Sequence, residues 1–191
     1  VYSDGLDLVV LDSAAATDGR LDRERLRFNF PRQQREPWLA LPDYFRDRRE
    51  AEADGPDVLA LQLVTMGSAI AAETNALFHG DAYRDYLELH GLSVQLTEAL
   101  AEYWHDRVRR ELNLPRPTED IADMIRHPTY TGERFSFGYP ACPDLEQRAK
   151  IVDLLEPSRI DVILSEEFQL IPEQSTDALI VHHPEAHYFK V

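Results

Sequence analysis

The segment from Arg134 to Asp144 combines residue types that suit the binding of a small anion. Arg134 carries a planar guanidinium that can bind a carboxylate through two parallel hydrogen bonds. Gly138 permits a positive φ or a close approach of the backbone to a ligand, and Pro140 and Pro143 stiffen the chain that follows. The pattern predicts a shaped loop that binds a small anionic metabolite. An arginine-capped turn between two elements would have the same composition, so that alternative stays open.

A carboxylate falls within a long stretch of helical periodicity. Glu98 follows Val94 by four residues and precedes Ala101 by three, which places it on a stripe with small apolar residues. If that stripe faces inward, the carboxylate needs a partner, because a lone buried charge is costly. A ligand cation would serve, and so would an arginine of the protein.

Other reactive residue types give weaker signals. Tyr188 and Phe189, near the end of the sequence, can pack on the core or present a ring to a ligand. Cys142 has no identifiable base and is expected to be a small packed residue. Adjacent histidines on a strand point to opposite faces, so His182 and His183 do not predict a metal site.

Hydrophobic periodicity predicts the elements that position these residues. Strands are expected over residues 6–11, 26–30, 57–66, 160–164 and 178–182. The third is a continuous apolar run, typical of a central strand covered on both faces. The longest helix is expected from about 82 to 112, and shorter helices over 119–126 and from Asp144. Residues 46–55 are expected to form a solvated loop. The order favours a single α+β domain with a mostly antiparallel twisted sheet, one long helix and several shorter helices.

Composition narrows the class of protein. The chain has 191 residues, a net charge of −15, 43% hydrophobic residues and one cysteine. These values fit one globular domain. The negative charge argues against a nucleic-acid partner, since phosphate binding requires clustered cations. No run approaches the roughly 18 apolar residues of a membrane span, and one cysteine cannot form an internal disulfide. We therefore expect a protein of the reducing cytoplasm with no membrane partner.

Several segments resemble, in order, the activation domain of cobalamin-dependent methionine synthase. Residues 134–143 match its signature R-x-x-x-G-Y-P-A-C-P. The other similar segments are Leu41–Phe45, Asp57–Gly67, Leu96–His105 with Arg107–Arg110, and His183–Phe189. The resemblance covers nearly the whole chain, so residues 1–191 are interpreted as this domain. A start at Val1 without methionine predicts a C-terminal fragment of a larger modular enzyme, with the first part of the domain missing.

The resemblance implies a binding site for S-adenosylmethionine. The implied ligand-binding residues are Glu98, Arg134, Ser136, Gly138, Tyr139, Tyr188 and Phe189. S-adenosylmethionine carries a carboxylate, which suits Arg134, and cationic groups, which suit Glu98. An aromatic face from Tyr188 or Phe189 suits the sulfonium or the adenine. Ser136 stands where the family often has alanine and would act through its backbone.

The implied function is reductive reactivation of the enzyme. In the family, S-adenosylmethionine is placed above a cobalamin held by a neighbouring module, while a flavodoxin-type donor supplies an electron, and methyl transfer regenerates methylcobalamin. The chain alone would then bind no cobalamin, contribute no catalytic residue and show no turnover. The alternative is a stand-alone S-adenosylmethionine-binding or sensor module without a cobalamin partner. An independent methyltransferase is a further alternative, although no G-x-G-x-x-G opens a βαβ unit.

Basic residues are concentrated near the N-terminus. Between Arg20 and Arg49, nine arginines face five acids, a local charge of +4. Arg25 and Arg27 are two apart on an expected strand and should share its exposed face. An acidic electron donor would be steered toward this patch. An ordinary mixed-charge surface would have the same composition, so both interpretations remain open.

Overall fold

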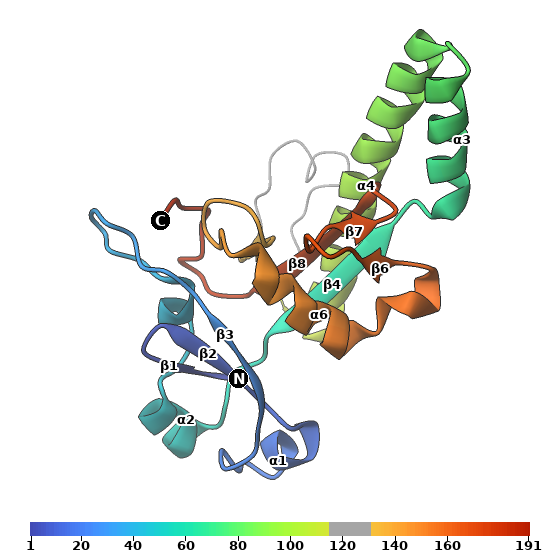
Figure 1. The fold of residues 1–191 in the computed structure, drawn as a ribbon. Coiled ribbons are helices and arrows are strands. Elements are labelled where there is room, and N and C mark those ends of the chain that lie inside the picture. Colours follow the sequence, from blue (N-terminus) through green and yellow to red (C-terminus); the bar gives the residue numbers. More distant parts are fainter. Residues whose placement is uncertain (115–130) are drawn as a thin grey trace. The chain divides into compact units, whose positions relative to one another are not determined.

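The computed structural model describes residues 1–114 and 131–191, and these form two compact units (Figure 1). The first unit comprises Val1–Ala60, Thr131–Lys150 and Leu179–Val191. The second comprises the described part of 61–130 together with Ile151–Ala178. Strands and helices are mixed in an α+β architecture with antiparallel sheets and one long helix, which confirms the predicted fold class. None of the described helices is long and apolar enough to span a membrane.

The first unit is built on a three-stranded antiparallel sheet. Its order is β1 (Tyr2–Asp4), β2 (Asp7–Leu11) and β3 (Glu24–Asn29), which confirms the predicted strands over 6–11 and 26–30. Leu8 lies opposite Phe28, and both side chains are fully buried. The register shifts near the end of β2, where Val10 pairs with Leu26 but Leu11 pairs with Glu24. Arg25 is therefore the extra residue of a β-bulge.

Short helices follow this sheet. They are α1 (Ser13–Thr17), the 3-10 helix η1 (Leu41–Tyr44) and α2 (Arg48–Asp54). The prediction of a solvated loop over 46–55 is wrong, because Asp47 and Glu50 form a capping box that starts α2. Ala51 is buried on its inner side, and Gly55, at φ 88°, ends the helix. The signal was present in the sequence as an Asp three residues before a Glu.

The second unit contains an antiparallel helical hairpin. It consists of α3 (Ser68–His79) and α4 (Tyr83–Glu111), which lie side by side in Figure 1. α4 confirms the long helix predicted over 82–112, whereas α3 was not predicted. The helix predicted over 119–126 lies outside the described residues. Gly67 and Gly80 bound α3, and its alanine-rich sequence has the propensity of a helix without a strong apolar stripe.

The remaining elements, from residue 133 onward, belong partly to the first unit and partly to the second. They are β5 (Glu133–Phe135), η2 (Leu145–Gln147), α6 (Arg148–Leu155), η3 (Pro157–Ile160), β6 (Ile163–Leu164), β7 (Leu170–Ile171) and β8 (Ser175–Val181). β6 and β7 form a two-stranded antiparallel ribbon. In the first unit, Leu179–Val181 of β8 pair antiparallel with β5.

β4 (Ala60–Thr65) lies beside β8 at the end of the strand order β4-β8-β5. The prediction of a central strand at 57–66 is therefore wrong for the described residues. An unbroken apolar run reports burial of both faces, and it does not report how many neighbouring strands are present.

Candidate functional site

Arg134 is the middle residue of strand β5, so the shaped loop begins after it. It pairs with Ile180 of β8, and its backbone N–H donates to the Glu133 carboxylate at 3.0 Å. Phe135, the next residue, is fully buried. Successive side chains of a strand point to opposite faces, so the half-buried Arg134 lies on the other face of β5. Its guanidinium is carried by a regular strand, which is a more rigid support than a loop.

The loop after β5 is held by its own backbone. The Gly138 N–H donates to the Cys142 carbonyl, and the Cys142 N–H donates to the Tyr139 carbonyl, each at 3.0 Å. Gly138 has φ 87°, and a Cβ there would lie 3.0 Å from Leu145 Cδ1. The Cys142 thiol is buried and donates to the Ser136 carbonyl at 2.9 Å, as expected of a packed residue. The Gly138 N–H is therefore used within the loop.

A buried arginine fastens this loop to the core of the first unit. Arg148 donates from Nη2 to the Phe137 carbonyl at 3.0 Å. The Phe137 ring stacks against Phe28 and Phe30, with centroid distances of 5.7 and 6.1 Å. Sequence reasoning missed Arg148, because nothing local distinguishes it from the many exposed arginines.

The C-terminal aromatic pair lies beside the same loop and strand. Tyr188 stacks on Phe135 at 6.2 Å with an interplanar angle of 13°, and the buried Phe189 lies 6.0 Å from Phe135. The Val191 N–H donates to the Pro140 carbonyl at 3.2 Å. Burial raises the pKa of the Tyr188 hydroxyl, against a hydrogen bond with the Ala141 backbone that lowers it. The phenol therefore stays neutral at physiological pH.

Two further residues organise this C-terminal segment and were not predicted. Tyr44 of η1 lies 6.5 Å from Phe135 and 6.3 Å from Phe189, ring centroid to ring centroid. Gln33 donates from Nε2 to the Lys190 carbonyl at 2.7 Å and accepts the Leu39 N–H at 3.1 Å. The sequence signal for Tyr44 was its segment, Leu41–Phe45, which is one of those that carry the family resemblance.

Most of the predicted ligand-binding residues therefore belong to one unit. Those of the first unit are Arg134, Ser136, Gly138, Tyr139, Tyr188 and Phe189. Tyr139 and Tyr188 are 57% and 43% exposed, so their rings are available to a ligand. Glu98 belongs to the second unit, on α4. Its side chain is exposed, so the stripe does not face inward at this position, and the carboxylate does not need a buried partner.

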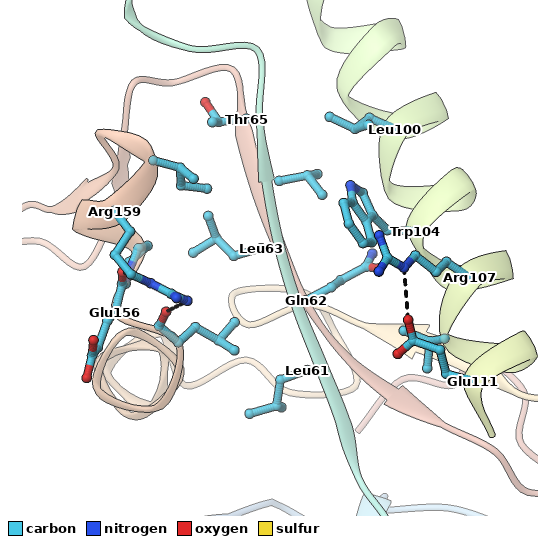
Figure 2. Close-up of a pocket in the computed structure, with 15 residues that line it drawn as sticks. Leu61, Gln62, Leu63, Thr65, Leu100, Trp104, Arg107, Glu111, Glu156 and Arg159 are labelled. Carbon is cyan, nitrogen blue, oxygen red and sulfur yellow. Dashed lines mark hydrogen bonds and ion pairs between the residues drawn. The ribbon is translucent and has the colours of Figure 1, made fainter.

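A pocket of about 600 Å³ lies within the second unit (Figure 2). Its walls are strand β4, the C-terminal half of α4 and residues 155–160. None of the residues predicted to bind S-adenosylmethionine lines it. Within 1–114 and 131–191, no group of three or more His, Cys, Asp or Glu side chains is arranged to hold a metal ion.

The predicted docking residues, Arg25 and Arg27, lie on β3, but the charge of Arg27 is paired with carboxylates. Arg27 binds Glu24 through two hydrogen bonds of 2.8 and 2.6 Å and donates from Nη1 to Asp7 at 2.8 Å. The hydrogen bonds that Arg27 donates to the Glu24 and Asp7 carboxylates raise the pKa of Arg27. Arg25 is exposed, and the bulge interrupts the alternation that predicted a shared face. The positive potential of this surface is lower than the arginine count suggests.

Comparison with known proteins adds independent findings. Residues 1–191 match the family described as the activation domain of vitamin B12-dependent methionine synthase. The chain is 54% identical to methionine synthase of Mycobacterium tuberculosis strain H37Rv and 51% identical to that of Mycobacterium leprae. In both cases 99% of the chain is covered but only 16% of the relative. A solved structure, the MetH reactivation domain bound to AdoHcy, is similar with a TM-score of 0.86 and 25% identity, covering 99% of this chain and 57% of that one.

Proposed function

Because the chain belongs to the activation-domain family of vitamin B12-dependent methionine synthase, we propose that it is the S-adenosylmethionine-binding reactivation module of such an enzyme. The observation that carries the proposal is the convergence of β5, its loop and the C-terminal segment. Arg134, the Gly138 loop and the exposed Tyr188 ring belong to one compact unit. The similar solved domain was crystallised with AdoHcy, which shares the amino-acid and adenosine groups of the proposed ligand.

The chemistry of these residues complements S-adenosylmethionine. The Arg134 guanidinium would bind the ligand carboxylate in a charge-assisted pair. The ring of Tyr188, stacked on Phe135, would support the adenine or the sulfonium. Ser136, Gly138 and Tyr139 would contribute loop contacts. Phe189 completes the set of the first unit, and Glu98, on α4 of the second unit, is the remaining residue that the family implies.

The family resemblance implies separate roles for this chain and for the cobalamin-binding module of the enzyme. Cobalamin on a neighbouring module would supply the methyl acceptor and the redox change. The residues of this chain would bind and orient S-adenosylmethionine, which contributes to the rate through positioning. We therefore expect purified chain to leave S-adenosylmethionine intact. Methyl transfer by the chain alone, detected as S-adenosylhomocysteine by chromatography, would contradict this expectation.

The single cysteine supports a cytoplasmic location, and the family resemblance implies a protein electron donor of the flavodoxin type. Such a donor would approach the surface around Arg25 and Arg27. Replacing both by glutamate should slow its association at low salt and leave S-adenosylmethionine affinity unchanged. Stopped-flow mixing at several salt concentrations would measure this. Equal rates for parent and variant at low salt would exclude this surface.

Calorimetric titration of S-adenosylmethionine into Arg134 variants tests the site directly. Loss of a bidentate charge-assisted contact should cost about 2 to 4 kcal/mol, a weakening of roughly 30- to 1000-fold. Arg134→Lys should recover part of the loss, because an ammonium cannot reproduce the planar fork. Arg20→Ala is the matched control, since Arg20 is exposed and lies 3.8 Å from Asp18 in a weak surface pair. Equal affinity of the parent and Arg134→Ala would remove Arg134 from the site.

A further inference from the structure

Strand β4 ends its sheet but lacks the features that protect a sheet edge. In the part of the chain that the structure describes, only the edge of β4 toward β8 is paired with a strand. Residues 58–66 contain no charged residue and no proline. Exposed edges usually carry charges, proline or a bulge, because unpaired N–H and C=O groups attract another strand. The apolar composition of β4 fits burial of both its faces, and no charge or proline on it would oppose an added strand.

The pocket of the second unit runs along this open edge. All of Leu61 to Thr65 line it. Since successive side chains point to opposite faces, a pocket that touches each of them must pass around one edge of the strand. The Met66 N–H donates to the Gln174 carbonyl, directly before β8, at 2.9 Å. Because backbone groups alternate along a strand, the N–H groups of Leu61 and Leu63 point to the open edge.

The two walls of the pocket are largely apolar, although Arg107, Glu111, Glu156 and Arg159 also line it and the Arg107 guanidinium lies 4.6 Å from the centroid of the Trp104 ring. Leu100, Trp104 and Val108 of α4 form one wall, and Leu155, Pro157 and Ile160 contribute to the other. Figure 2 shows β4 passing between Trp104 on one side and the Glu156–Arg159 region on the other. Trp104 is 37% and Ile160 46% exposed, which is a large apolar area to leave in water. An extended segment placed here would be covered on both faces.

Gln62 is a further sign of a missing partner. Its side chain is 6% exposed and lines the pocket, where Figure 2 shows it on the side of Trp104 and Arg107. Neither its Nε2 nor its Oε1 has a hydrogen-bond partner among the described residues. A buried amide left unpaired is destabilising, because it has lost its hydrogen bonds to water without replacing them. A backbone or polar group entering the pocket could satisfy it.

We propose that this groove receives an extended segment of the same methionine synthase, from outside residues 1–191, that adds a strand to the open edge of β4. The similar solved reactivation domain has only 57% of its residues matched by this chain, and the curated relatives only 16%. A tethered segment has a high effective concentration and needs little affinity of its own. It should be an apolar run of about five residues with one polar group toward Gln62. The inference rests on the chain being part of such an enzyme and is independent of S-adenosylmethionine binding.

Hydrogen–deuterium exchange tests the added strand. The 191-residue chain and the full-length synthase containing it would be compared at the Leu61 and Leu63 amides. We expect exchange to be about 100-fold slower or more in the synthase, with the Leu179 and Ile180 amides protected in both. Equal exchange in the two proteins would overturn the proposal. Protection in the short chain that rises with concentration, together with a dimer mass by light scattering, would overturn it in favour of a second copy.

A variant pair separates groove occupancy from folding. Leu63→Glu places a charge on the groove wall and should return the β4 amides of the full-length synthase to the rates of the short chain. Leu87→Glu is the matched control, because Leu87 is 50% exposed on α4 and does not line the pocket. If the Leu63→Glu enzyme keeps full protection of β4 while remaining folded, no strand occupies the groove. S-adenosylmethionine titration of the same samples distinguishes this outcome from failure of the proposed ligand site.

Discussion

Replacement of Tyr44 by alanine would show whether the Tyr44 ring holds the C-terminal aromatic residues Tyr188 and Phe189 in position. Tyr44 is 8% exposed, and its ring lies 6.5 Å from Phe135, 6.3 Å from Phe189 and 5.5 Å from His183. Truncation of a buried aromatic ring with this many neighbours costs about 3 to 5 kcal/mol of unfolding free energy. For a chain of this size, that loss corresponds to a fall in Tm of roughly 6 to 20 °C.

Tyr44→Phe provides the control, because it keeps the ring and removes only the hydroxyl. Because the buried hydroxyl has no hydrogen-bond partner among the described residues, its removal should change Tm by no more than about 2 °C. Calorimetric melting gives both values. Titration with S-adenosylmethionine at 15 °C, where we expect both variants to be folded, gives the functional effect. Tyr44→Ala should weaken binding by about tenfold or more, because Phe135 and Phe189 lose the ring that fixes Tyr188, whereas Tyr44→Phe should bind normally.

Two outcomes would refute this reasoning. A Tyr44→Ala protein that melts within about 2 °C of the parent would show that the ring contacts add little to stability. A folded Tyr44→Ala protein with parental affinity would show that ligand binding does not depend on the order of the C-terminal segment. Tyr83→Ala controls for nonspecific loss of an aromatic ring, since Tyr83 is 58% exposed on α4.

Two further perturbations test the supports of the site. The Asp43 carboxylate accepts hydrogen bonds of 2.7 and 2.8 Å from Arg32. Burial raises the pKa of Asp43, but the hydrogen bonds from Arg32 and from the Ala40 N–H lower it more, so the pKa lies below its ordinary 3.8. The parent should therefore melt at a higher temperature than Asp43→Asn, with the whole difference present above pH 3.8. The difference should disappear as pH falls through the lowered pKa of Asp43. An unchanged difference at about pH 2 would contradict this prediction. Gly138→Ala should lower the free energy of unfolding by about 1 to 2 kcal/mol, because φ is 87°, and should weaken ligand binding. Gly91→Ala in α4 is the control: its Cβ would meet no atom within 4 Å, so stability should be unchanged or higher. Equal melting temperatures of the two variants would refute the strain argument.

Local rules account for the parts of the fold that depend on neighbours in sequence. The periodicity of α4 and the alternation of β3 gave those elements within a few residues, because an apolar stripe is encoded in consecutive positions. The same rules failed for α2, where many charges suggested a loop although a capping box was present. They also placed Arg134 in a loop, because a three-residue strand is too short to show alternation.

The candidate site depends on contacts that no local pattern contains. Tyr44 meets Phe135 and Phe189 through ring contacts, and Gln33 bonds Lys190 across 157 positions of sequence. Periodicity and propensity act over a window of about 10 to 20 residues, so they cannot report such pairs. The residue types gave the chemistry of Arg134 and Gly138, whereas the family resemblance supplied Tyr188 and Phe189. Arg148 had neither signal, because its role appears only once Phe137 is buried beside it.

The disagreement at β4 differs in kind from these failures. Apolar composition reports that both faces of β4 are removed from water, which helices can provide as well as strands, so it does not place the strand within its sheet. Among the described residues, β4 lies at an edge of its sheet and lines a largely apolar pocket, where the Gln62 amide has no hydrogen-bond partner. These three observations have one physical explanation if a further strand belongs beside Leu61 and Leu63. The proposed strand from elsewhere in the enzyme would then cover an edge that the described residues leave unpaired.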